Sequence, residues 1–187
     1  MSTLTFDLSY DDLVDCFGPD RVERSVREDA AALGFTGPTL EFLRSTGIPS
    51  TLRAGVGAPG KEISLRAFGE MSREQWTVPE ESRNWIILGN LSATTVSLDT
   101  ATGAVFGFDE GFEDPVALHA DVSSLAYTIY AVKCALAEIA GLSAFDERNT
   151  VIQSVRQEID DRDPLPFAHE DGEWNATLEE IAMGMWA

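Results

Sequence analysis

The chain has few basic side chains and few of the residues that usually carry catalysis. Its 187 residues include 13 Lys and Arg against 32 Asp and Glu, which gives a formal net charge of −19, and only two histidines and two cysteines. Residues 1–83 hold 9 basic and 14 acidic side chains, whereas residues 84–187 hold 4 and 18. We expect neither nucleic acid nor a membrane as partner, because such a negative field repels phosphate and anionic lipid. It favours a basic protein partner, or it serves only solubility.

Long apolar runs and a secretory leader are also missing. No stretch approaches the roughly 18 uninterrupted apolar residues that indicate a membrane-spanning helix. Residues 1–12 contain neither a basic region nor an apolar run, which predicts no signal peptide and a cytoplasmic location. In that compartment Cys16 and Cys134 are expected to be reduced thiols, and both lie within apolar helical patterns.

Motifs for catalysis or for metal binding are incomplete. Residues 55–61 carry the glycines and the lysine of a phosphate-binding loop, but Glu62 replaces the Ser or Thr that binds magnesium, and a strand-like pattern follows instead of a helix. We interpret this segment as a hairpin loop. His119 and His169 have no second His or Cys at metal-site spacing, and both are expected in solvated loops. The sequence therefore predicts no enzyme, no cofactor and no metal site.

The N-terminal segment, residues 1–50, is predicted to be mainly helical. Ser9 can cap a short helix, with Asp12 three residues further on completing a capping box. Thr36 can cap a second helix, which Gly47 closes. Residues 20–33, between these helices, have no clear period and are expected to be partly helical.

Residues 51–108 are predicted to form a sheet. Short apolar or alternating runs are separated by turn residues at 51–55, 62–68, 85–88, 94–98 and 104–108. In the second run, apolar Ile63 and Leu65 alternate with polar residues, which is typical of a half-buried strand. Short connections such as the one at Thr102 and Gly103 favour antiparallel pairing.

Residues 121–187 are predicted to form the helices that support this sheet. Asp121 or Ser123 can cap the strongest one, which carries an apolar stripe of Leu125, Ile129, Val132, Leu136 and Ile139. A second helix is expected over about residues 146–161, and the last helix should bury Leu178, Ile181, Ala182 and Met185. Residues 162–173 are the expected mobile loop. The pattern predicts one α+β domain over residues 1–187, with a mixed or mainly antiparallel sheet of about five to six strands packed against helices.

An acidic segment joins the predicted sheet to the predicted helices. No Lys or Arg lies between residues 84 and 132. Within that stretch, Asp109, Glu110, Glu113 and Asp114 surround Phe112, an arrangement typical of an aromatic binding anchor with a polar rim. These five residues are the candidate partner-binding site. The alternative is a solvated charged loop with no partner.

Short motifs occur in a fixed order along nearly the whole chain. They are Phe-Leu-Arg-Ser-Thr-Gly-Ile-Pro at 42–49, Trp-Ile-Ile-Leu-Gly at 85–89, Leu-Asp followed by Thr-Gly-x-Val at 98–105, the helix start at Asp121, and Trp174 followed by Leu178 and Gly184. Their order and spacing resemble the SUKH superfamily, and its fourth immunity family most closely.

The resemblance implies an α+β protein that neutralises a toxin used in bacterial conflict, with no catalytic residues to carry over. Toxins neutralised by such families are often nucleases or nucleic-acid deaminases, whose substrate grooves tend to be basic. An acidic inhibitor suits such a groove because it occupies the field meant for phosphate. We therefore expect an immunity protein that blocks a basic toxin domain by direct binding. A general interaction or regulatory module of the same fold is the alternative.

Overall fold

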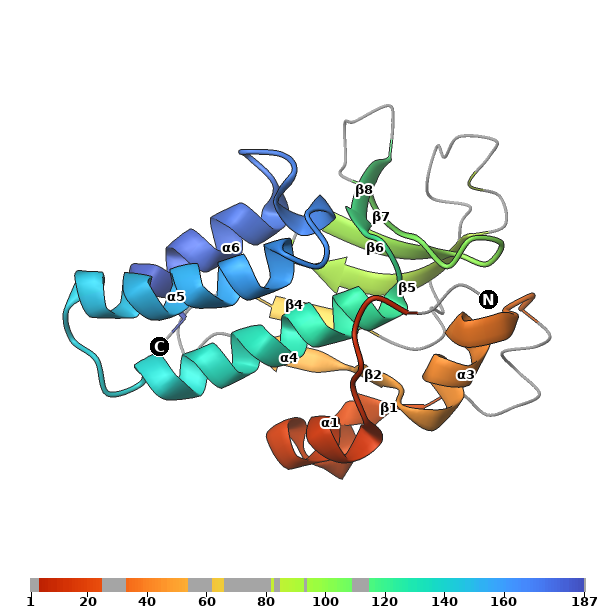
Figure 1. Cartoon of the computed structure of the whole chain (residues 1–187), viewed down its shortest axis with the longest axis horizontal. Helices are drawn as coiled ribbons and strands as arrows, with labels where there is room; N and C mark the ends of the chain where they lie inside the picture. Colours follow the sequence, from red (N-terminus) through yellow and green to blue (C-terminus); the bar gives the residue numbers. More distant parts are fainter. Residues whose placement is uncertain are drawn as a thin grey trace.

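The centre of the molecule is a twisted sheet with one long helix, α4, beside it (Figure 1). This computed structural model describes residues 4–24, 33–53, 62–65, 82, 85–92, 94–108 and 115–186. The predicted hairpin loop at 55–61 and the acidic segment at 109–114 lie outside the described residues.

The N-terminal part contains short elements: α1 (Tyr10–Phe17), η1 (Pro19–Arg21), β1 (Val22–Glu23), α3 (Gly37–Ser45) and β2 (Ile48–Pro49). The predicted capping box is confirmed, because Ser9 Oγ accepts from the Asp12 N–H at 3.1 Å and Asp12 Oδ2 accepts from the Ser9 N–H at 2.9 Å. Gly47 follows α3 with a φ of 83°, a conformation that favours glycine.

Residues 20–33 are described only in part, so the prediction of partial helix stays untested over most of this range. Only η1 is helical among the described residues of this range, and β1 follows it and pairs with β2 in a separate antiparallel ladder. A ladder of two residues per strand is too short to leave a period in the sequence. Residues 25–32 lie outside the described part.

The main sheet has six strands in chain order: β3 (Thr51–Arg53), β4 (Glu62–Leu65), β5 (Trp85–Leu91), β6 (Thr94–Asp99), β7 (Val105–Phe108) and β8 (Val116–His119). Each strand pairs antiparallel with the next, which confirms the predicted fold class. The first five lie within or overlap the apolar runs that predicted them. The last one, β8, is not signalled by such a run, because it is short and directly follows the acidic segment.

His119 requires a correction. The sequence places it in a solvated loop, but it is the last residue of β8 and its side chain is 0% exposed. A single polar residue after an acidic stretch has no pattern that distinguishes a buried strand end from a loop. Its burial depends on partners from elsewhere in the chain.

The helical part contains α4 (Val122–Ile139), α5 (Phe145–Asp160), η4 (Leu165–Phe167) and α6 (Glu173–Ala182). Asp121 caps α4 as predicted, since its Oδ1 accepts from the Ser123 and Ser124 N–H groups at 2.8 and 3.1 Å. By length and composition α4 could cross a membrane, but its apolar stripe packs into the core. Leu136 is the exception in that stripe, because it is only partly buried.

Two further expectations about the C-terminal part are wrong. Residues 162–173, predicted to be a mobile loop, contain η4, and Asp163, Pro166 and Phe167 in this segment are buried. Met185 was expected to face inward on the last helix, but α6 ends at Ala182 and Met185 is 46% exposed. In both cases tertiary packing, which a local pattern does not record, decides the position.

The N-terminal segment before α1 is held against the start of α4. The Thr5 N–H and Oγ–H both donate to Asp121 Oδ2 at 2.8 Å, and the Phe6 N–H donates to Ser123 Oγ at 3.0 Å. The guanidinium of Arg162 lies 4.3 Å from the centre of the Phe6 ring and donates to the Thr5 carbonyl. This segment thereby ties the N-terminal part to the start of α4 and to the turn after α5.

Candidate partner-binding site

A buried polar network connects β8, α4, η4 and α6. Trp174 Nε1–H donates to His119 Nε2 at 2.8 Å, so Nε2 carries no proton and the neutral ring has its proton on Nδ1. His119 Nδ1–H can then donate to Ser124 Oγ, 3.0 Å away, and the Ser124 hydroxyl donates to Asp163 Oδ2. All four side chains are buried, so these bonds fix the relative positions of the elements that carry them.

Asp163 also holds the turn before η4 against the end of β8. Its Oδ2 accepts from the Ala120 N–H at 2.8 Å, and its Oδ1 accepts from the Leu165 N–H at 3.1 Å. These bonds explain why a charged residue in the predicted loop is buried: a carboxylate that accepts several N–H and O–H bonds is stabilised inside the protein.

The network contains Ser, His and Asp, but its arrangement differs from a hydrolytic triad. The serine lies between the histidine and the aspartate, and Asp163 Oδ2 is 3.9 Å from His119 Nδ1. No substrate can reach Ser124, whose side chain is fully buried. Burial lowers the pKa of His119 to about 4, although the nearby carboxylates of Asp163 and Asp121 act in the opposite direction. The network therefore holds structural elements in place, and its histidine is neutral at neutral pH.

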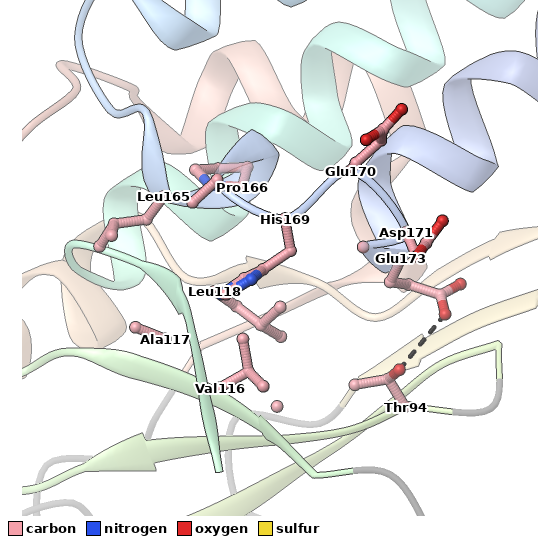
Figure 2. A pocket seen from close by; sticks show the side chains of 13 residues that line it. Thr94, Val116, Ala117, Leu118, Leu165, Pro166, His169, Glu170, Asp171 and Glu173 are labelled. Carbon is pink, nitrogen blue, oxygen red and sulfur yellow. Dashed lines mark hydrogen bonds between the residues drawn. The ribbon is translucent and has the colours of Figure 1, made fainter.

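The network places residues 165–173 beside β8, and a hollow of about 450 Å³ lies between them (Figure 2). Apolar side chains line one part of the hollow, namely Val116, Ala117 and Leu118 from β8 and Leu165 and Pro166 from η4. Polar side chains on the turn after η4 line the other part, namely His169, Glu170, Asp171 and Glu173. We call this feature the acidic hollow.

The acidic edge of the hollow is anchored at both ends. Thr94 Oγ1 on β6 donates to Glu173 Oε2 at 3.3 Å, as Figure 2 shows. The His169 carbonyl accepts from Asn175 Nδ2 at 2.7 Å and closes the turn. Between these anchors Glu170 and Asp171 are exposed to solvent. The hollow thus combines an apolar lining with carboxylates that reach into water.

The structure does not place the predicted site residues. Asp109, Glu110, Phe112, Glu113 and Asp114 lie outside the described residues, so none of them is placed. Gly107 on β7 and Val116 on β8, each two positions outside the segment, line the hollow. Sequence reasoning did not find the hollow, because its two linings come from distant parts of the chain.

Comparison with known families agrees with the fold. The model of the SUKH-4 immunity proteins matches residues 8–180, which is most of the chain. The chain belongs to the SUKH-4 immunity protein family. No curated protein and no solved structure matches it. The family assignment confirms the resemblance that the ordered motifs indicated.

The basic residues of this SUKH-4 protein do little to neutralise the C-terminal surface. Arg148 donates to the Ala182 carbonyl at 2.8 Å and to carbonyls at the end of α4, so it caps helix ends. Arg156 lies 5.2 Å from the centre of the Phe167 ring, and Arg162 contacts the N-terminal segment. Residues 84–187 contain only 4 basic side chains against 18 acidic ones. The net field around the acidic hollow is therefore negative.

The described part of the SUKH-4 protein offers no metal site. Within it, no group of three or more His, Cys, Asp and Glu side chains is placed to hold a metal ion. The chemistry that the acidic hollow can supply is recognition: carboxylates for a cation and methyl groups for an apolar surface.

Proposed function

We propose that this SUKH-4 protein neutralises a cognate bacterial toxin by binding a basic domain of that toxin at the acidic hollow and the neighbouring segment 109–114. Membership of an immunity protein family supports toxin neutralisation. The observation that supports this surface is the juxtaposition of an apolar lining with exposed Glu170 and Asp171 in a half of the chain that is strongly acidic. Binding, without catalysis, blocks the toxin.

The chemistry of the acidic hollow suits lysine or arginine side chains of a partner. Such side chains have a long apolar stem and a charged end. The stem would contact methyl groups such as those of Val116 and Leu118, while the charged end would meet Glu170 or Asp171 at the edge. Both contacts contribute to affinity. The apolar stem leaves water for an apolar surface, and the charged end exchanges water for a carboxylate.

The acidic segment would extend this surface. Asp109, Glu110, Glu113 and Asp114 would supply four more carboxylates, and they would accelerate encounter with a basic partner. Phe112 would serve as the apolar anchor, whose main effect is on dissociation. Gly107 and Val116, each two positions outside the segment, line the hollow, and this supports the role.

The toxin is proposed to be a nuclease or a nucleic-acid deaminase. Enzymes of both kinds bind phosphate in a basic groove, and a negatively charged protein surface can occupy the same field. The attraction should weaken with added salt, because ~0.15 M salt screens charges that are more than ~8 Å apart. Through this attraction the net charge of −19 would serve binding in addition to solubility.

Binding kinetics with matched charge variants test the surface. The partner is recovered by pulldown from the native cell, and its association is measured with wild type, with Glu170→Gln/Asp171→Asn, and with the control Glu138→Gln/Asp15→Asn. The control removes the same charge from exposed positions on α4 and α1, and Glu138 lies about 24 Å along α4 from its start beside β8. We expect roughly threefold or more slower association for the first pair and a smaller effect for the control. Equal slowing by both pairs would show that net charge alone matters.

The acidic segment is tested by two further variants. Replacing its four carboxylates with amides should slow association, and Phe112→Ala should accelerate dissociation. Unchanged rates for both variants would remove residues 109–114 from the interface. The function itself is tested by co-expression with toxins encoded beside this protein in a killing assay. Cells should survive only with the immunity protein, and death in its presence for every such toxin would contradict the proposed function.

A further inference from the structure

The two cysteines of the chain lie next to each other in the fold, although 118 positions separate them in the sequence. Cys16 is in the last turn of α1 and Cys134 is in the second half of α4, and their Sγ atoms are 3.9 Å apart. Cys16 is partly buried and Cys134 is exposed. Leu13 and Phe17, on the same helix as Cys16, are buried in the core and fix α1 in this position.

We propose that Cys16 and Cys134 form a reversible disulfide that joins α1 to α4 when the protein meets a hydroperoxide. A disulfide requires the sulfur atoms to approach by about 2 Å from their present separation. Rotation about the side-chain bonds can supply this movement, because Cys134 is exposed.

The different environments of the two thiols set the order of the reaction. Burial raises the pKa of Cys16 to about 12, so Cys16 remains a thiol at neutral pH. Exposed Cys134 meets the hydroperoxide first, and its thiolate attacks the peroxide oxygen. An S–O bond forms, the O–O bond breaks, and the alcohol leaves with a proton, which gives a sulfenic acid on Cys134.

Cys16 then resolves this intermediate. Its sulfur attacks the Cys134 sulfur, an S–S bond forms and the S–O bond breaks, and water leaves with the proton of the Cys16 thiol. In total the two thiols lose two electrons and two protons, and the hydroperoxide takes these up and is reduced to alcohol and water. A small-molecule dithiol reverses the reaction by thiol–disulfide exchange.

The disulfide would close a loop that contains every strand of both sheets. Closing so long a loop restricts the unfolded chain, so the thermal midpoint of the oxidised protein should rise by on the order of 10 °C. In Figure 1, α1 and α6 lie on opposite sides of α4, so the acidic hollow is remote from the disulfide. Partner binding should therefore be equal in the oxidised and reduced forms.

The experiment uses the full chain treated with hydrogen peroxide or with dithiothreitol. We expect the oxidised monomer to lose both free thiols and the mass of two hydrogen atoms. Proteolysis should then yield a linked peptide pair containing Cys16 and Cys134. The thermal midpoint should be higher than that of the reduced protein, and dithiothreitol should restore the lower value. Cys16→Ser and Cys134→Ser serve as matched controls, and neither should show the intramolecular mass loss. Covalent dimers, overoxidised monomers that keep an unlinked Cys16, or unmodified thiols in the wild type would each overturn the proposal.

Discussion

Acidification should destabilise this protein through His119 by an amount that its burial determines. The pKa of His119 is about 4 in the folded protein, against an ordinary value of 6.5 in an unfolded chain. Because the folded value is the lower one, the contribution of His119 is fully present above pH 6.5 and is lost as the pH falls toward 4. In this window the unfolded chain takes up a proton that the folded protein excludes.

The size of the loss follows from the two pKa values. A pH of 5 lies about 1.5 units below the pKa of the unfolded histidine. Each unit corresponds to about 1.4 kcal/mol, so the free energy of unfolding falls by about 2 kcal/mol. The loss levels off near 3 kcal/mol below pH 4, where the folded ring is also protonated. Protonation of the ring adds a buried positive charge that faces a Trp174 N–H donor, which explains why the folded protein resists it.

Urea unfolding at pH 7.5 and pH 5.0 measures this contribution. Carboxylates also respond to pH, so the useful quantity is the difference between wild type and His119→Gln in their loss of stability. We expect His119→Gln to lose about 2 kcal/mol less than wild type. The control is His169→Gln, at an exposed position, which should lose as much as wild type. Equal losses for wild type and His119→Gln, or an NMR titration of the His119 ring above pH 6, would refute the reasoning.

Two further predictions concern the packing of the helices, and denaturant unfolding at pH 7.5 checks both. Asp163→Ala removes the acceptor of two backbone N–H groups and one hydroxyl, so it should lower the free energy of unfolding by about 3 kcal/mol or more. A decrease below about 1 kcal/mol would mean that water replaces the carboxylate. Leu125→Ala should cost about 2–5 kcal/mol, as buried large-to-small substitutions do, and Leu136→Ala should cost clearly less because Leu136 is only partly buried. A larger loss for Leu136→Ala than for Leu125→Ala would show that the buried face of α4 is assigned wrongly.

Much of the fold could be predicted from local sequence signals. The capping box at Ser9 and the cap at Asp121 depend on residues within three positions of each other, so their chemistry can be read directly from the sequence. The apolar runs of β5, β6 and β7 likewise depend on neighbouring residues and short turns. β8 has four residues and few local signals, and so it was missed.

The site was less predictable, because it depends on contacts between distant residues. Burial of His119 follows from a bond to Trp174, 55 positions further on, and burial of Asp163 from a bond to the Ala120 N–H, 43 positions before it. A single sequence gives no periodicity for such pairs. Net charge, by contrast, is additive, so the acidic character of the C-terminal half was readable, whereas the apolar lining of the hollow was not.

The contacts of the N-terminal segment determine when this segment can fold during synthesis. Residues made early bond to residues made more than 100 positions later: Thr5 with Asp121, Phe6 with Ser123, and the Thr5 carbonyl with Arg162. The strands of the main sheet pair with their neighbours in chain order, so they can assemble while translation continues. The apolar ring of Phe6 has to wait until residue 162 has emerged before it is covered. The nascent chain therefore exposes this ring until then. The segment before α1 is among the last parts to adopt its final contacts.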